Sequence, residues 1–187
     1  MKYWTGVTVV SLVAIAAATA CAPSDTKEGK EGAAAMQTVP DSAGNVAMHL
    51  MKFDTLDFVA FSVEHLDRFA ESHDPNITVT FPDGHETHGL PKHLEDMRAM
   101  FAALPDLKIA EHPIKIGNGS WTAVTGRMTG TFTKPMPIGN GKFIQPTGKK
   151  LDLTMATIGH WNAAGLMDHE WLFWDNQAYM TQLGIKP

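Results

Sequence analysis

The sequence predicts an α+β domain in which helices precede antiparallel strands. Up to Pro105, apolar residues recur at the three- and four-residue spacing of amphipathic helices. Beyond Pro105, extended segments alternate with Asn-Gly and Ala-Ala-Gly turn sequences. A run of helices followed by a run of strands is typical of α+β domains. The 187-residue chain is 44% hydrophobic and 19% charged, which suffices for one such domain with appended segments.

Three helices are expected in the first half of the domain. The first covers about residues 46–59 and the second about 63–72, with a break near 60–62. The third begins with Pro91, a favoured residue in a first helical turn, and stops at Pro105. Its predicted apolar face comprises Leu94, Met97, Met100, Phe101 and Leu104.

The strands are expected mainly in the second half. Turns at 117–119 and 163–165 predict antiparallel pairing of the strands on either side of them. After a turn at Asp175-Asn176, a short helix closes the domain. The expected extended segments are 76–84, 107–116, 121–133, 150–161 and 166–175.

The N-terminus carries an export signal. Residues 1–20 combine Lys2 with an uncharged apolar run, and Ala18, Thr19 and Ala20 stand directly before Cys21, the chain's lone cysteine. Small residues before a cysteine are typical of a bacterial lipobox, although Ala18 stands where leucine is usual. The sequence therefore predicts cleavage and lipidation of Cys21. Ordinary signal cleavage at a nearby A-x-A site and a retained transmembrane anchor are the alternatives.

A tether separates this signal from the domain. Residues 21–45 contain the lipidated cysteine and a stretch rich in Ala, Gly, Ser, Lys and Glu without apolar periodicity, so the domain is expected at 46–187. The predicted location is the bacterial cell envelope, with a lipid anchor in the membrane. A net charge of −5 without a basic stripe predicts that nucleic acid is not a partner.

Several short motifs occur in a characteristic order along the domain. They are NITVTFPDG (76–84), AALPDLKI (102–109), GTFT (130–133), PTGKKL (146–151), WLFWD (171–175) and QLG (182–184). By these motifs the chain from about His73 to Gly184 resembles the SnoaL-like polyketide cyclases, also called ester cyclases, of the nuclear transport factor 2-like fold. The resemblance implies a curved antiparallel sheet wrapped around N-terminal helices, a cone-shaped cavity for a small hydrophobic ligand, and no cofactor.

The chain departs from the family at its catalytic positions. Leu172 stands where the resemblance places the general acid-base aspartate. Phe132 replaces the histidine of a Gly-Thr-His sequence, and Thr157 matches the position of a second cavity histidine. Because leucine cannot move protons, the aldol cyclisation of those enzymes does not transfer residue by residue.

Glu170 is the candidate proton carrier. Alternation along a strand puts it in one row with Asp168, Leu172 and Trp174, and the resemblance places this row inside the cavity if no bulge intervenes. Apolar walls are expected to raise the pKa of its carboxyl group, which suits acid-base catalysis. The alternative is an ion pair of Glu170 with Arg127 or a histidine.

Further candidates surround this position. Asp175 is a second possible catalytic residue, with capping of the last helix as the alternative. The opposite row of the strand, which contains Trp171, could serve packing or a homodimer interface. The predicted substrate-binding residues are His73, His88, Phe101, Phe132, Thr157, Leu172 and Trp174.

The sequence lacks the motifs of several other enzyme classes. No G-x-S-x-G, P-loop or G-x-G-x-x-G sequence is present. Among the nine histidines, His85 and His88 are the closest pair, with His73 and His93 to either side. In an extended segment the rings of His85 and His88 would point to opposite faces, so no metal site is predicted. A loop that brings the histidines together on zinc or iron is the alternative.

Two functional hypotheses remain. In the first, the protein is an enzyme that uses cofactor-free acid-base chemistry of the cyclase, isomerase or hydrolase type on a small hydrophobic carbonyl compound. In the second, it is a lipoprotein that binds a small molecule without catalysis. A third possibility is an interaction module whose cavity is filled by its own Met and Phe side chains. Burial of the Glu170 carboxyl group in the cavity would favour the enzyme.

Overall fold

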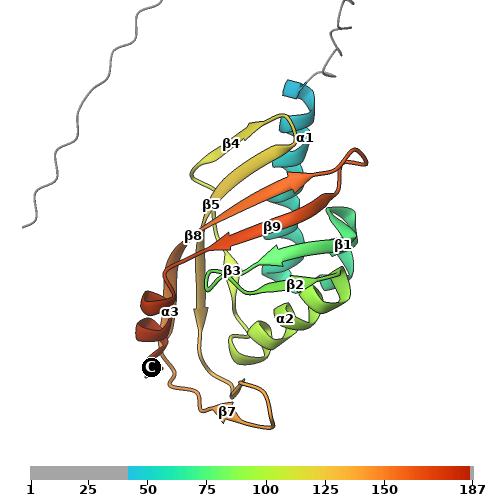
Figure 1. Cartoon of the computed structure of the whole chain (residues 1–187). Coiled ribbons are helices and arrows are strands. Elements are labelled where there is room, and N and C mark those ends of the chain that lie inside the picture. Colours follow the sequence, from blue (N-terminus) through green and yellow to red (C-terminus); the bar gives the residue numbers. More distant parts are fainter. Residues whose placement is uncertain (1–41, 186–187) are drawn as a thin grey trace, which may run out of the picture. The chain divides into compact units, whose positions relative to one another are not determined.

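The computed structural model describes residues 42–185 (Figure 1). The predicted signal peptide, Cys21 and most of the tether lie outside the described residues. Within 42–185, no helix is long and apolar enough to cross a membrane.

The N-terminal helical layer is one interrupted helix rather than two separate ones. Helix α1 (Ser42–Thr55) continues into the π-helical turn η1 (Leu56–Ala60) and the 3-10 turns η2 (Phe61–Val63) and η3 (Leu66–Glu71). Glu64, with φ 58°, turns the chain between η2 and η3. The break predicted near 60–62 therefore falls where the helical geometry tightens.

The other two helices begin and end at the expected signals. Helix α2 (Leu90–Ala103) follows Gly89, whose φ of 86° suits glycine, and Pro105 stands just after its last turn. Helix α3 (Asn176–Leu183) is capped by Asp175, whose Oδ1 accepts a hydrogen bond of 2.9 Å from the Ala178 amide.

Seven strands form one sheet in the order β2-β1-β9-β8-β5-β3, with β4 also paired to β5. All pairs are antiparallel except β1 with β9, which is parallel. The strands are β1 (His73–Thr80), β2 (Glu86–His88), β3 (Lys108–Ile109), β4 (Lys115–Asn118), β5 (Trp121–Thr131), β8 (Lys150–Trp161) and β9 (Met167–Phe173). Strands β6 (Met136–Pro137) and β7 (Phe143–Ile144) form a separate small hairpin.

The expected strand at 107–116 is wrong as one element. The structure divides it into β3 and β4, because residues 111–113 make no backbone hydrogen bond to β5. Pro113 cannot donate a ladder hydrogen bond, and His112 turns toward α1 and η1 to bind two carboxyl groups. The following turn also moves, from 117–119 to Gly119-Ser120.

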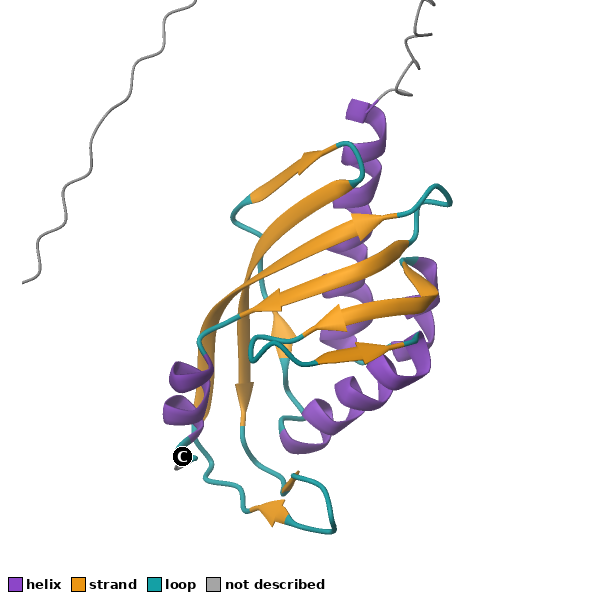
Figure 2. Cartoon of the chain, in the orientation of Figure 1, coloured by secondary structure: helices purple, strands orange, loops and turns teal. Residues whose placement is uncertain are grey.

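The long strands β5, β8 and β9 curve across helix α1, which lies behind them in Figure 2. One face of this sheet is buried against the helices. In register across β5, β8 and β9 lie Val124, Thr157 and Leu172, all buried. Along the same face, Glu170 lies between Gly159 of β8 and Val79 of β1. The curved α+β architecture is therefore as predicted.

A bulge resets the alternation at the start of β9. His160 pairs with His169 and Trp161 with Met167, so Asp168 is the extra residue. Asp168 consequently leaves the cavity row and accepts a 2.6 Å hydrogen bond from His160 Nδ1. The expectation that Asp168 shares the row of Glu170 is wrong, whereas Glu170, Leu172 and Trp174 keep their common face.

Candidate functional site

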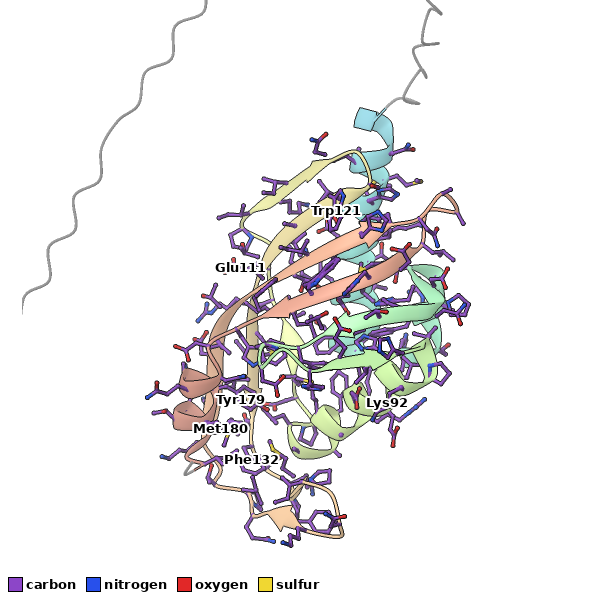
Figure 3. The ribbon with its side chains drawn as sticks, viewed as in Figure 1. Lys92, Glu111, Trp121, Phe132, Tyr179 and Met180 are labelled. Carbon is purple, nitrogen blue, oxygen red and sulfur yellow. The ribbon has the colours of Figure 1, made fainter. Side chains whose placement is uncertain are left out.

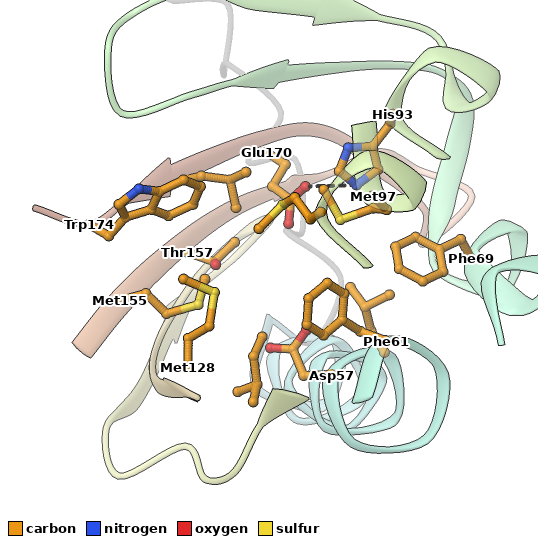
Figure 4. Close-up of a pocket in the computed structure, with 14 residues that line it drawn as sticks. Asp57, Phe61, Phe69, His93, Met97, Met128, Met155, Thr157, Glu170 and Trp174 are labelled. Carbon is orange, nitrogen blue, oxygen red and sulfur yellow. Dashed lines mark ion pairs between the residues drawn. The ribbon is translucent and has the colours of Figure 1, made fainter. Parts of the chain in front are cut away.

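An apolar cavity lies between the curved sheet and the helical layer (Figure 4). The centre of a water molecule can occupy only about 40 Å³ of it, so side chains fill most of the cavity in the unliganded protein; the roughly 450 Å³ of space between the lining atoms includes open solvent. Its lining residues are Leu56, Asp57, Phe61, Phe69, His93, Met97, Met100, Ile109, Met128, Met155, Thr157, Glu170, Leu172 and Trp174. The four methionines have flexible, polarisable side chains, so the wall can adapt to ligands of different shape.

Glu170 projects into this cavity from β9. The residue is 5% exposed, and the cavity wall around it includes Leu172 and Trp174. The structure thus places the carboxyl group where the sequence predicted it. Its catalytic role stays a prediction.

Two buried histidines approach the carboxyl group from different elements. His93 Nε2, on α2, lies 3.5 Å from Glu170 Oε2, as the dashed line in Figure 4 marks. His73 Nε2, at the start of β1, lies 3.9 Å from the same oxygen. Both separations exceed the length of a good hydrogen bond, and Glu170 Oε2 has no hydrogen-bond partner. The carboxylate is therefore near two imidazoles without being saturated by either.

The ring of His73 is held by its other nitrogen. His73 Nδ1 lies 3.1 Å from the carbonyl oxygen of Phe69 and 2.9 Å from Ser72 Oγ. Because a carbonyl oxygen can only accept, this contact favours a proton on Nδ1. In the neutral imidazole, Nε2 then directs a lone pair toward Glu170.

The pKa of Glu170 follows from these neighbours. Burial acts to raise its pKa, but the proximity of His73 and His93 outweighs burial and holds the pKa below its usual range. The expectation of a raised pKa is therefore wrong for the unliganded protein. Two histidines do lie beside Glu170, as the alternative expected, but at 3.5 and 3.9 Å. Arg127 instead pairs with Asp152 at the surface. Burial also lowers the pKa of His93 to about 4.

Asp57 provides a second buried carboxyl group, from η1 on the helical side of the cavity (Figure 4). His112 Nε2 lies 2.7 Å from Asp57 Oδ2, and His112 Nδ1 lies 2.9 Å from Asp54 Oδ1. Lys115 donates a 2.7 Å hydrogen bond to the other oxygen of Asp54. A chain of polar groups therefore leads from the cavity to the surface.

The pKa values of the two cavity carboxyl groups, Glu170 and Asp57, are shifted in opposite directions. Burial raises the pKa of Asp57, and hydrogen bonding to His112 only partly offsets this. Hydrogen bonds to Asp57 and Asp54 outweigh the burial of His112 and raise its pKa. A cavity with one carboxyl group tuned downward and another tuned upward can hold a base and an acid at the same pH.

Sequence reasoning missed Asp57 and His93. Asp57 follows Phe53 by four residues, and His93 precedes Met97 by four, so each shares a helix face with a buried apolar residue. A polar residue on an otherwise apolar face was the available signal.

The predicted site residues divide between the cavity and other places. Thr157, Leu172 and Trp174 line the cavity, and His73 lies behind Glu170. Phe101 and Phe132 are buried in the core without lining the cavity, and in Figure 3 Phe132 lies toward the end of the sheet near α3.

His88 and Asp175 lie outside the cavity wall. His88 is exposed on β2, where its Nδ1 lies 3.2 Å from Thr78 Oγ1. Asp175 caps α3, the local role weighed against catalysis. Neither residue contacts the cavity in this structure.

This fold and cavity define a nuclear transport factor 2-like domain with a small-molecule pocket. The sequence model of the SnoaL-like polyketide cyclases matches residues 55–183, and the chain belongs to this family. The family binds small ligands, and membership indicates cyclase-type chemistry without a cofactor. No curated protein matches the chain.

Solved structures share the fold at low sequence identity. A candidate SnoaL-like polyketide cyclase from Jannaschia sp. CCS1 is 18% identical, with a TM-score of 0.65 over 79% of this chain and 96% of that one. IdmH, a candidate polyketide cyclase from Streptomyces antibioticus, is 20% identical, with a TM-score of 0.60 over 73% and 99%. AclR, a candidate hydroxylase from Streptomyces galilaeus, is 19% identical, with a TM-score of 0.60 over 76% and 99%.

Proposed function

We propose that the protein is an enzyme that moves a proton on a small, largely apolar carbonyl compound, with Glu170 as base and Asp57 as acid. The observation that carries this proposal is the pair of buried carboxyl groups in the wall of one apolar cavity, one on the sheet and one on the helical layer. Each has histidine neighbours that set its proton affinity.

The proposed step begins at a carbon atom next to a carbonyl group. Glu170 takes the proton from this carbon, and the electron pair of the C–H bond moves to the carbonyl oxygen. A protonated Asp57 donates a hydrogen bond to that oxygen as its negative charge develops. The resulting enolate can attack a second carbonyl group in the same molecule, which closes a ring, or take its proton back at another carbon, which isomerises the substrate.

The position of Glu170 accounts for the missing family aspartate. The resemblance places the family aspartate at Leu172, and Glu170 lies two residues earlier on the same face of β9. A glutamate side chain is one methylene longer than aspartate, which helps the carboxyl group reach the cavity from the neighbouring position. This placement supports the proposal that the acid-base group is displaced along the strand to Glu170.

Proton exchange tests this proposal without knowledge of the natural substrate. Apolar ketones such as 2-tetralone are incubated with the protein in D₂O, in the presence of EDTA, and loss of the α-proton signal is followed by NMR. We expect protein-dependent exchange that Glu170→Gln lowers by at least about 100-fold, the lower range for general-base catalysis.

A control variant shows whether the effect comes from the cavity carboxyl group or only from the loss of one negative charge. Glu86→Gln makes the same chemical change at an exposed position on β2 and should leave exchange unaltered. If wild-type protein binds the ketones and catalyses no exchange, the function is ligand binding. If Glu170→Gln exchanges as fast as wild type, Glu170 is not the base.

For the N-terminus we propose export and lipid anchoring through Cys21. Support comes from the apolar run and the small residues before the chain's single cysteine. Metabolic labelling with a radioactive fatty acid should mark the wild-type protein and not Cys21→Ala. Equal labelling of both would contradict the proposal.

A further inference from the structure

Three buried potential metal ligands converge behind the cavity. His73 comes from β1, His93 from α2 and Glu170 from β9, and their ligand atoms all lie within 4.8 Å of one another. Each residue is at most 5% exposed. Three elements distant in sequence thus bring two imidazoles and one carboxylate to a single point.

The polar atoms at this point lack partners. His73 Nε2 and Glu170 Oε2 are both buried without a hydrogen bond. An unpaired buried polar atom costs about 1–3 kcal/mol, and a charged one costs more. The contact from His73 Nδ1 to the Phe69 carbonyl oxygen favours a proton on Nδ1, so that Nε2 offers a lone pair. Two lone-pair acceptors facing each other need a proton or a cation between them.

The two distances from Glu170 to the histidines need only a small contraction to suit a metal ion. Zinc binds imidazole nitrogen at about 2.0–2.1 Å, which places tetrahedral ligands roughly 3.3 Å apart. Glu170 Oε2 already lies 3.5 Å from His93 Nε2 and 3.9 Å from His73 Nε2. The hydrogen bond that fixes His73 through its far nitrogen is the arrangement usual for metal-bound histidine.

We propose that His73, His93 and Glu170 form a binding site for one divalent transition-metal ion of the Zn²⁺ or Co²⁺ type. Imidazole nitrogens favour such ions over Mg²⁺ and Ca²⁺, which prefer oxygen ligands. Glu170 and His93 line the cavity, so an open coordination position would face a water molecule or ligand there.

This inference goes beyond the proposed function and sets a limit on it. A carboxylate that binds a cation is a weaker base, because the positive charge lowers the affinity of both oxygens for a proton. The metal-bound protein should therefore abstract a proton from carbon more slowly than the metal-free protein. Added Zn²⁺ should inhibit the ketone exchange reaction, and EDTA should restore it.

Cobalt binding tests the site directly. The full-length protein is purified with a chelator, the chelator is removed, and Co²⁺ is titrated while the visible absorption spectrum is recorded. We expect one equivalent to bind with the intense d–d bands of a four- or five-coordinate site. His93→Asn and Glu170→Gln should weaken binding by at least tenfold. His88→Asn, which alters an exposed histidine, should bind as wild type does.

X-ray absorption of the wild-type zinc complex provides a second test that does not depend on the variants folding. Two imidazoles and one carboxylate in the first coordination shell support the site, and a different set of protein donors overturns it. Absence of a stoichiometric Co²⁺ band, or equal affinity in all variants, also overturns it. Because the exchange assay contains EDTA, loss of the metal proposal leaves the acid-base proposal intact, and the reverse also holds.

Discussion

Lowering the pH should destabilise the protein through His93, and replacing His93 with leucine should remove this effect. Burial lowers the pKa of His93 to about 4, against 6.5 for the unperturbed group. Between pH 6.5 and pH 4, His93 binds a proton in the unfolded chain and stays neutral in the folded protein. Proton binding therefore favours the unfolded chain, and the free energy of unfolding decreases as the pH falls toward 4.

The size of the effect follows from the shift. The pKa of His93 falls from 6.5 to about 4, a difference of about 2.5 units, and each unit corresponds to about 1.4 kcal/mol. Between pH 7 and pH 4 the wild-type protein should therefore lose about 3 kcal/mol from this group. Lower pKa values for His49 and His169 add to the loss in both proteins and cancel in the comparison.

Urea unfolding at several pH values measures this difference. The free energy of unfolding is determined for wild type and His93→Leu between pH 7 and pH 4, with EDTA present. The variant is expected to lose less stability than wild type over this range, whatever its stability at pH 7. Parallel curves would refute the conclusion that His93 is neutral in the folded protein.

The remaining predictions concern other parts of the domain. Asp57→Asn should lower the rate of ketone exchange by about 10- to 100-fold. Its ligand affinity, measured by isothermal calorimetry, should stay within a few-fold of wild type. An unchanged exchange rate would show that Asp57 is not the acid. Asp175→Ala should lower the free energy of unfolding in urea by about 1 kcal/mol, because the cap of α3 is lost. Ketone exchange should persist in this variant. A loss of exchange at unaltered stability would instead support a catalytic role for Asp175. On the outer sheet face, Trp171 stacks on Trp121 with ring centroids 5.4 Å apart. If this face forms a homodimer interface, wild type should be a dimer in analytical ultracentrifugation and Trp171→Glu a monomer. A monomeric wild type would leave packing as the role of Trp171.

The sequence predicted the elements whose signals are local. Pro91 and Pro105 bracket α2, and the residues around Asp175 predict a turn followed by a helix, because capping and proline sterics act within a few residues. Alternation placed Glu170 and Leu172 on one face, which persists along β9 after its bulge, and the resemblance indicated that this face lines the cavity. The motif resemblance supplied the curvature of the sheet, which no local pattern specifies.

The features that the sequence did not predict depend on contacts between distant segments of the chain. The separation of β3 from β4 reflects the long-range pairing of His112 with Asp54 and Asp57, which spacing cannot show. The bulge at Asp168 also depends on its partner strand. The lowered pKa of Glu170 arises from His73 and His93, residues on other elements.

A crystal structure of the protein with an enolisable ketone bound tests the central claim most directly. We expect the carbonyl oxygen to lie within hydrogen-bonding distance of Asp57, with the acidic carbon facing the Glu170 carboxylate. A ketone bound elsewhere, or a cavity closed by the methionine side chains with Glu170 out of reach, would contradict it.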